Sequence, residues 1–201
     1  MSKLDRKNEF LETTMKIISE SGLDNFAMKK VTLRMGVSES LLYKYYPTKE
    51  ELLYSCFESV HKEIGGLFQE TKFPMIESRE ELVHAVHDIW KKYFMFLVKN
   101  DYKTIFYFEY RDSLYMRQAI AHDSEARNSY FLYFVNILKE IDNYCNVQIS
   151  TASSVLWTYI LDTSGIFAKR MIRKDIPMNN KTIEQIWGLL AFGLVGLLKE
   201  S

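Results

Sequence analysis

The segment MKKVTLRMGVSESLLYKYYPTKEEL, residues 28–52, predicts two short helices, a tight turn and the start of a third helix. The first helix covers residues 28–34 and ends before Gly36, where the chain needs a positive φ that only glycine adopts without strain. Ser38 then supplies a side-chain oxygen that can cap a second helix over about residues 38–45. Two short helices joined by a glycine-containing turn predict a helix-turn-helix, whose second helix has the right size for the DNA major groove.

The end of this segment contains signals for the end of the second helix and for the start of the next one. Pro47 ends the second helix, because the residue before a proline is pushed out of the α region. Thr48 can cap the next helix, and Glu51 three residues later completes a capping box. Apolar residues at helical spacing continue as far as Leu67, so this helix is long. We expect the glycine pair at residues 65–66 to weaken or bend it.

Upstream, residues 5–21 form an amphipathic helix with Gly22 as its stop. Together with the helix-turn-helix, this pattern resembles the DNA-binding domain of the tetracycline-repressor (TetR) family of bacterial regulators over residues 8–55. The residues that carry the resemblance are Leu11, Ile18, Gly22, Gly36-Val37-Ser38, Leu42-Tyr43, Tyr45-Tyr46 and Lys49-Glu50-Glu51-Leu52. The resemblance implies a DNA-binding domain over residues 1–50 and a helical ligand-binding and dimerisation domain over residues 51–201.

Composition sets wider bounds. The chain has 201 residues, three prolines, eight glycines and a formal net charge of zero, with no strand-like alternation between turn signals. This pattern predicts an all-α fold of about nine or ten helices. Cys56 and Cys145 are too few for a disulfide framework and lack metal-ligand spacing. The charged N-terminus does not match a signal peptide, and the longest apolar run, residues 186–198, is too short to span a bilayer. A cytoplasmic protein follows.

The last two predicted helices, residues 150–174 and 180–199, are apolar nearly all round. Such a helix must be covered on every side, and one domain covers only one face. A second copy of the chain would cover the other, so the pattern predicts a homodimer, and the resemblance implies the same four-helix interface. Two DNA-binding heads related by two-fold symmetry can bind a palindrome together.

The second helix of the helix-turn-helix carries most of the expected DNA contacts. From its spacing, Leu42 and Tyr46 turn inward and the other side chains face outward. The resemblance implies that Glu39, Ser40, Leu41 and Tyr45 face base edges, whereas Tyr43, Lys44 and Lys49 contact phosphates. The alternative to DNA contact is an ordinary solvent-exposed helix face, with Tyr43 partly buried in the core. The full set of predicted DNA-binding residues is Lys29, Ser38, Glu39, Ser40, Leu41, Tyr43, Lys44, Tyr45 and Lys49.

A dense set of aromatic residues predicts a ligand site, because such sites lie between the helices of bundles. An ordinary helical core is the alternative for most of them. Glu109 and Arg111 would be costly to bury unpaired, so they pair with each other, with Asp112 or with Arg117, or one of them meets a charged ligand. A carboxylate among aromatic rings suits a cationic aromatic compound. The predicted ligand-binding residues are Trp90, Phe94, Phe106, Glu109, Tyr110, Tyr130, Phe134 and Trp157.

No sequence pattern indicates catalysis. The chain has no GxSxG, P-loop, HExxH or CxxC pattern, and we expect no cofactor. His84 and His87 stand three residues apart beside Asp88, an arrangement more typical of surface histidines than of a metal site. The prediction is therefore a homodimeric, ligand-responsive repressor that leaves a palindromic operator when it binds an aromatic or hydrophobic small molecule. An activator, or an all-helical binding protein or enzyme with a vestigial head, are the alternatives.

Overall fold

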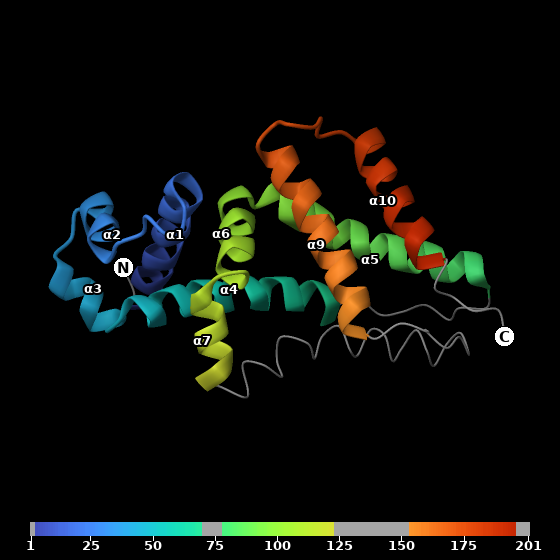
Figure 1. Ribbon diagram of the computed structural model, residues 1–201. Coiled ribbons are helices and arrows are strands. Elements are labelled where there is room, and N and C mark those ends of the chain that lie inside the picture. Colours follow the sequence, from blue (N-terminus) through green and yellow to red (C-terminus); the bar gives the residue numbers. More distant parts are fainter. Residues whose placement is uncertain (1–2, 70–77, 123–152, 196–201) are drawn as a thin grey trace. The chain divides into compact units, whose positions relative to one another are not determined.

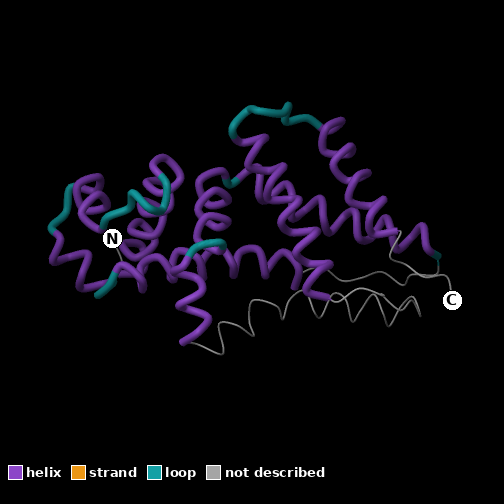
Figure 2. The backbone as a smooth tube through the Cα atoms, viewed as in Figure 1, coloured by secondary structure: helices purple, strands orange, loops and turns teal. Residues whose placement is uncertain are grey.

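The computed structural model describes residues 3–69, 78–122 and 153–195, and within these ranges all regular structure is helical (Figures 1 and 2). The all-α prediction is confirmed. The sequence also predicts a long helix capped by Ser124, and that helix lies outside the described residues. The nine described helices are α1 (Lys3–Ser21), α2 (Met28–Met35), α3 (Glu39–Tyr45), α4 (Lys49–Gln69), α5 (Arg79–Lys99), α6 (Asp101–Arg111), α7 (Leu114–His122), α9 (Ser153–Ile172) and α10 (Asn180–Val195).

The ends of these helices follow from local chemistry. Gly22 and Gly36 have φ values of 81° and 65°, as their predicted roles at the ends of α1 and α2 require. Ser38, Thr48 and Ser78 precede α3, α4 and α5, and each side-chain oxygen accepts a hydrogen bond from the backbone N–H three residues later, at 3.3, 3.1 and 3.1 Å. These bonds satisfy amides that a helix start leaves without intrahelical partners.

α4 runs without interruption through the glycine pair at residues 65–66 and ends at Gln69. The predicted weak point therefore does not break the helix. A Cβ atom added at Gly66 would meet no atom within 4 Å. None of the helices that the structure describes has the length and apolar character needed to cross a membrane.

The described chain forms two compact units. The first contains residues 3–63 and 100–122, and the second contains residues 64–69, 78–99 and 153–195. α6 and α7 thus belong with the N-terminal helices, and α1 packs along α6. The division near residue 50 predicted from the sequence concerns DNA and ligand binding, and it stays a prediction.

In the first unit, two groups of buried side chains hold the helices together. Phe10, Ile18, Val31 and Leu42 are fully buried among α1, α2 and α3. Between α4 and α6, the Phe57 and Tyr107 rings stack with centroids 5.1 Å apart, next to the His61 ring. The His61 Nδ1 atom lies 3.1 Å from the Tyr107 hydroxyl. Cys56 is a buried free thiol, and burial raises its pKa well above the ordinary value.

The second unit is built around tryptophan. The Trp90 ring of α5 lies 5.0 Å from the Phe94 ring and 5.3 Å from the Trp187 ring of α10, while its Nε1–H donates to Ser164 Oγ of α9 at 3.0 Å. These contacts satisfy the one polar atom of a large buried ring.

Charged side chains close the α5–α10 contact in this unit. Lys91 Nζ lies 2.6 Å from Glu184 Oε1, and His87 Nε2 lies 3.0 Å from Glu184 Oε2. The Lys91 ammonium group holds the pKa of Glu184 below its usual value, with a smaller contribution from His87. His87 is therefore a half-buried link between two helices, while His84 is exposed. In the described part of the chain, no cluster of three or more metal-ligating side chains occurs.

Two glycines allow a matched test of helix ends and helix interiors. We expect Gly36→Ala to lower the free energy of unfolding by about 1 kcal/mol, because alanine is strained at positive φ. Gly66→Ala should raise it by about 0.5–1 kcal/mol, because alanine favours a helix interior and the space is open. Urea unfolding at one protein concentration measures both. Equal effects of the same sign would contradict the assignment of Gly36 as a left-handed helix end.

Candidate nucleic-acid interface

The turn between α2 and α3 is closed by backbone hydrogen bonds. The N–H of Gly36 donates to the Leu33 carbonyl at 3.3 Å, and the N–H of Val37 donates to the Thr32 carbonyl at 3.0 Å. These bonds pair carbonyls that the end of α2 would otherwise leave without partners. The chain then enters α3 directly at Ser38. Ala27 precedes α2 and makes no side-chain cap bond.

α3 is anchored through its inner face. Leu42 is fully buried and Tyr46 nearly so, as their spacing predicts. Burial raises the pKa of Tyr46 to about 12, so its hydroxyl stays protonated over the physiological range. The Tyr45 ring lies 5.5 Å from the Phe10 ring of α1. Contacts at three positions within little more than one turn thus fix the rotation of α3 about its axis.

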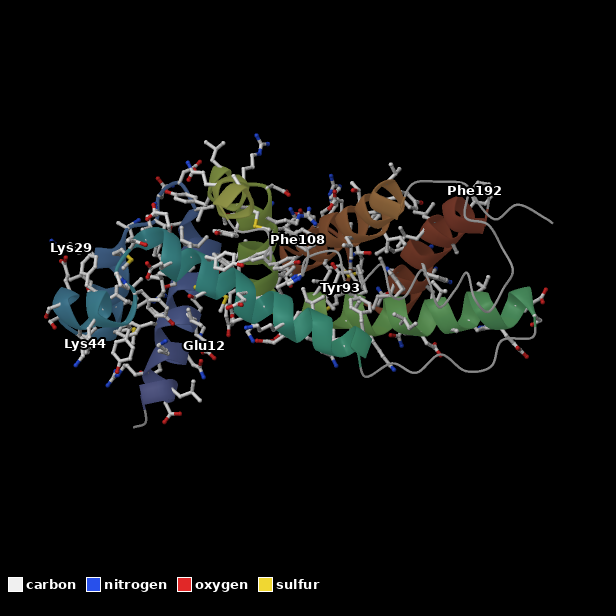
Figure 3. The ribbon with its side chains drawn as sticks, turned by 90° about the horizontal axis from the view of Figure 1, so that it is seen from below. Glu12, Lys29, Lys44, Tyr93, Phe108 and Phe192 are labelled. Atoms are coloured by element: carbon white, nitrogen blue, oxygen red, sulfur yellow. The ribbon has the colours of Figure 1, made fainter. Side chains whose placement is uncertain are left out.

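The outer face of α3 is open and polar. Glu39, Ser40 and Lys44 are exposed, and Tyr43 is 45% exposed. Tyr43 is thus exposed but partly covered, and the choice between a DNA contact and a solvated face with Tyr43 as partial core stays open. Lys29 of α2 is also exposed, and Figure 3 shows Lys29 and Lys44 at the outer edge of this unit. A fixed helix with polar side chains between two lysines can place itself in a groove and contact phosphates on its sides.

Two predicted base-contacting residues differ from this description. Leu41 and Tyr45 are half-buried rather than fully exposed. Tyr45 turns toward α1 because Phe10 offers it a ring contact, so it takes part in holding α3. Ser38 uses its hydroxyl locally, as the cap of α3 and in a 3.0 Å contact with Ser40 Oγ. The individual base and phosphate contacts remain predictions.

Some basic side chains of the head are already engaged within it. Arg34 of α2 forms two hydrogen bonds with the Glu20 carboxylate of α1, at 2.8 and 2.9 Å. The bond from Arg34 lowers the pKa of Glu20, and the same bond raises that of Arg34. Lys30 Nζ donates to the Asn25 carbonyl at 2.7 Å. Sequence reasoning missed the Arg34–Glu20 pair, because the partners lie 14 residues apart on different helices.

Lys49, the first residue of α4, is half-buried. Its Nζ atom lies 5.6 Å from the Phe26 ring centroid and 5.0 Å from the Tyr115 ring centroid. Both distances fall within the range of cation–π attraction. Neither aromatic partner was singled out from the sequence.

The predicted ligand-binding residues divide between the two units. Trp90 and Phe94 stack in the second unit. Phe106 and Tyr110 are buried in the first, where the Tyr110 ring lies 5.3 Å from that of Phe57. Burial raises the pKa of Tyr110. Tyr130 and Phe134 lie outside the described residues, as does the side chain of Trp157, so this site stays a prediction.

The structure resolves the two charged residues of the aromatic segment. Arg111 Nε pairs with Asp112 Oδ1 at 3.1 Å, which confirms one of the predicted pairings. Its guanidinium group also lies 4.6 Å from the Phe108 ring centroid. Glu109 Oε2 accepts a hydrogen bond from the backbone N–H of Leu23 at 3.2 Å, an arrangement the sequence did not suggest.

Comparisons with known proteins agree with this geometry. Residues 10–56 match the model of the bacterial regulatory proteins of the tetR family. The nucleoid occlusion factor SlmA of Mannheimia succiniciproducens is 27% identical over 97 residues, and the match spans 48% of this chain and 43% of that relative, less than half of either.

Solved structures share the fold over almost the whole chain. A TetR family transcription regulator from Marinobacter aquaeolei has a TM-score of 0.75 and 17% identity, with all of both chains covered. The transcriptional regulator FadR from Bacillus subtilis, in complex with stearoyl-CoA, has a TM-score of 0.67 and 18% identity over 91% of this chain and 96% of that one. At such identities the likeness concerns the fold.

Neighbouring tyrosines of α3 allow a test that separates packing from exposure. We expect Tyr45→Ala to lower the free energy of unfolding by about 2 kcal/mol, because a half-buried ring loses its contact with Phe10. Tyr43→Ala should change it by no more than about 0.5 kcal/mol, because that ring is solvent-facing. Urea unfolding compares the two variants. A larger loss for Tyr43→Ala would show that the orientation of α3 is wrong.

Proposed function

Because this chain belongs to the TetR family of bacterial transcriptional regulators, we propose that it is a cytoplasmic repressor that binds a palindromic operator as a homodimer and is released by a small molecule. The observation that carries the proposal is the outer face of α3. It presents exposed polar side chains in a fixed orientation, with Lys29 and Lys44 at its edge.

The DNA contacts divide by chemistry. Lysines and the Tyr43 hydroxyl are suited to phosphate oxygens, which set position and register on the duplex. Glu39 and Ser40 are suited to base edges, where a carboxylate can accept from cytosine N4. The buried Leu42 supports this division, because it prevents α3 from rotating and exchanging the two sets of side chains.

The dimer is assigned to α9 and α10. Large apolar side chains of these helices are exposed in the single chain, among them Leu189 at 64% and Phe192 at 86% (Figure 3). Large apolar side chains that gather on an exposed face are typical of protein–protein contacts. A second copy of the same helices would cover it and would set two heads on successive major grooves.

Release follows from a population shift. A ligand that binds the C-terminal helices in one conformation favours the head spacing of that conformation, and operator affinity falls if that spacing does not match the DNA. The aromatic residues of α5 support a hydrophobic or aromatic effector. Because the structurally similar FadR holds stearoyl-CoA, long acyl compounds belong in the ligand screen beside aromatic ones.

The first experiment is an unbiased selection of duplex DNA with the purified protein, followed by binding measurements over a range of salt. We expect an enriched palindrome and a steep loss of affinity with salt. Lys44→Ala should weaken binding and reduce the slope of log K against log salt by about 0.9, the contribution of one phosphate contact. Lys62→Ala is the control, because this exposed lysine of α4 pairs with Glu58 within the same helix. Absence of any enriched sequence and of salt-dependent binding would leave the vestigial-head alternative.

The dimer has its own test. We expect the wild-type chain to sediment as a dimer and Phe192→Glu to sediment as a monomer, because a charge at the centre of an apolar interface has no partner. Leu114→Glu is the matched control, since this leucine of α7 is 69% exposed but lies on neither α9 nor α10. A wild-type monomer, or a dimer that survives Phe192→Glu, would contradict the assignment.

A further inference from the structure

We infer that Tyr115 of α7 is a positioning residue for DNA binding, because it and Phe26 form two aromatic walls that hold the Lys49 ammonium group at the start of α4. We call Phe26, Tyr115 and Lys49 the lysine cage. The inference rests on the proposed function, in which Lys49 contacts a DNA phosphate, and it adds a determinant of affinity that lies outside the helix-turn-helix.

The cage solves an electrostatic difficulty at the start of α4. Lys49 is the first residue of that helix, where the helix dipole is positive and disfavours a cation. Glu50 and Glu51 in the same turn offset this charge, but both are exposed and neither fixes the position of the ammonium group. The negative faces of two aromatic rings, Phe26 and Tyr115, both attract the cation. The ammonium group is therefore held between 5.0 and 5.6 Å from two ring centroids, and Lys49 itself begins a helix whose first amides also favour phosphate.

The Phe26 wall is fixed from α6. Phe26 is buried, and its N–H donates to the Leu23 carbonyl at 3.1 Å, so the two residues belong to one turn. The N–H of Leu23 in turn donates to Glu109 Oε2 of α6 at 3.2 Å. Glu109 therefore holds the turn that carries one wall of the cage.

The Tyr115 wall is fixed by the connection between α6 and α7. The Ser113 hydroxyl donates to the Tyr110 carbonyl at 2.6 Å at the end of α6. Ser113 Oγ also accepts a bond from the N–H of Met116 at 3.4 Å, in the first turn of α7. Tyr110 and Met116 are both buried. One serine thus joins the two helices and sets where Tyr115 stands.

Both walls consequently depend on residues 101–122, although the cation they hold belongs to α4. A free lysine side chain loses rotamer freedom when it binds phosphate, whereas a caged one has lost much of it already. The cage therefore strengthens the phosphate contact of Lys49, and removal of one wall weakens it.

A double-mutant cycle tests this coupling on the enriched duplex, or on a random-sequence duplex at low salt. We expect Tyr115→Leu to weaken binding roughly threefold, the size of one exposed cation–π contact. In the Lys49→Ala background, Tyr115→Leu should add no further loss. Tyr115→Phe keeps the wall and should recover most of the affinity. Tyr102→Leu is the matched control, because that ring of α6 holds Lys16 at 5.0 Å, away from the predicted DNA contacts.

A measurement without DNA separates this inference from the proposed function. In the protein with 13C-methylated lysines, ring currents should displace the Lys49 methyl resonance, which Lys49→Ala identifies. Tyr115→Leu should move that resonance toward the position of exposed lysines, and Tyr115→Phe should not. Movement of the resonance without any DNA binding would confirm the cage and overturn its role at phosphate. An unmoved resonance, or equal losses of DNA affinity with and without Lys49 at an unchanged unfolding midpoint, would overturn the inference.

Discussion

An isolated helix of seven residues is not stable in water, and this constraint determines how the N-terminal unit is built. α3 has one capping serine and too few turns for cooperative stability, so its form depends on the surfaces that bury it. Leu42 provides the deepest of these contacts, and the Tyr45–Phe10 ring pair adds a second on the side of α1. Because these contacts hold the inner face of α3 against α1, the outer face has one fixed orientation. A helix that reads DNA needs such a fixed orientation.

The same dependence extends to helices far along the chain. α6 packs along α1, and the stacked Phe57 and Tyr107 rings join α6 to α4. The Glu109 carboxylate accepts a hydrogen bond from the backbone N–H of Leu23, which follows α1. The position of Glu109 within an aromatic run suggested a ligand contact. A buried amide without an intrahelical partner also needs an acceptor, however, and a carboxylate provides one. In the first unit, α1, α2 and α3 are thus supported by α6, whose Glu109 lies 86 residues beyond Leu23 in the sequence.

The features that could be predicted from the sequence were helix ends, which depend on local chemistry. The features that could not be predicted were side-chain contacts between residues far apart in the sequence. Gly36, Ser38 and Thr48 mark helix ends through their own backbone or side-chain chemistry, so α2, α3 and the start of α4 were placed to within a residue or two. The outward or inward direction of Leu41 and Tyr45 depended on which side of a short helix α1 covers, and spacing alone does not contain that information. The Arg34–Glu20 pair and the Lys49–Tyr115 contact join separate helices, so no periodicity signals them.

These distant pairs also explain how a chain with no net charge can present a positive edge to DNA. The sum over the sequence is zero, and the head holds nearly as many acidic as basic side chains. Position decides the outcome: Glu20 neutralises Arg34, and Lys30 is tied to a backbone carbonyl. Among the described residues, Lys29 and Lys44 make no comparable contact, and Lys49 is held by rings that leave its charge intact. Aromatic rings differ from carboxylates in this respect, since they fix a cation without cancelling its attraction for phosphate. A few well-placed charges can therefore set the affinity of such a surface for phosphate without a uniformly basic surface.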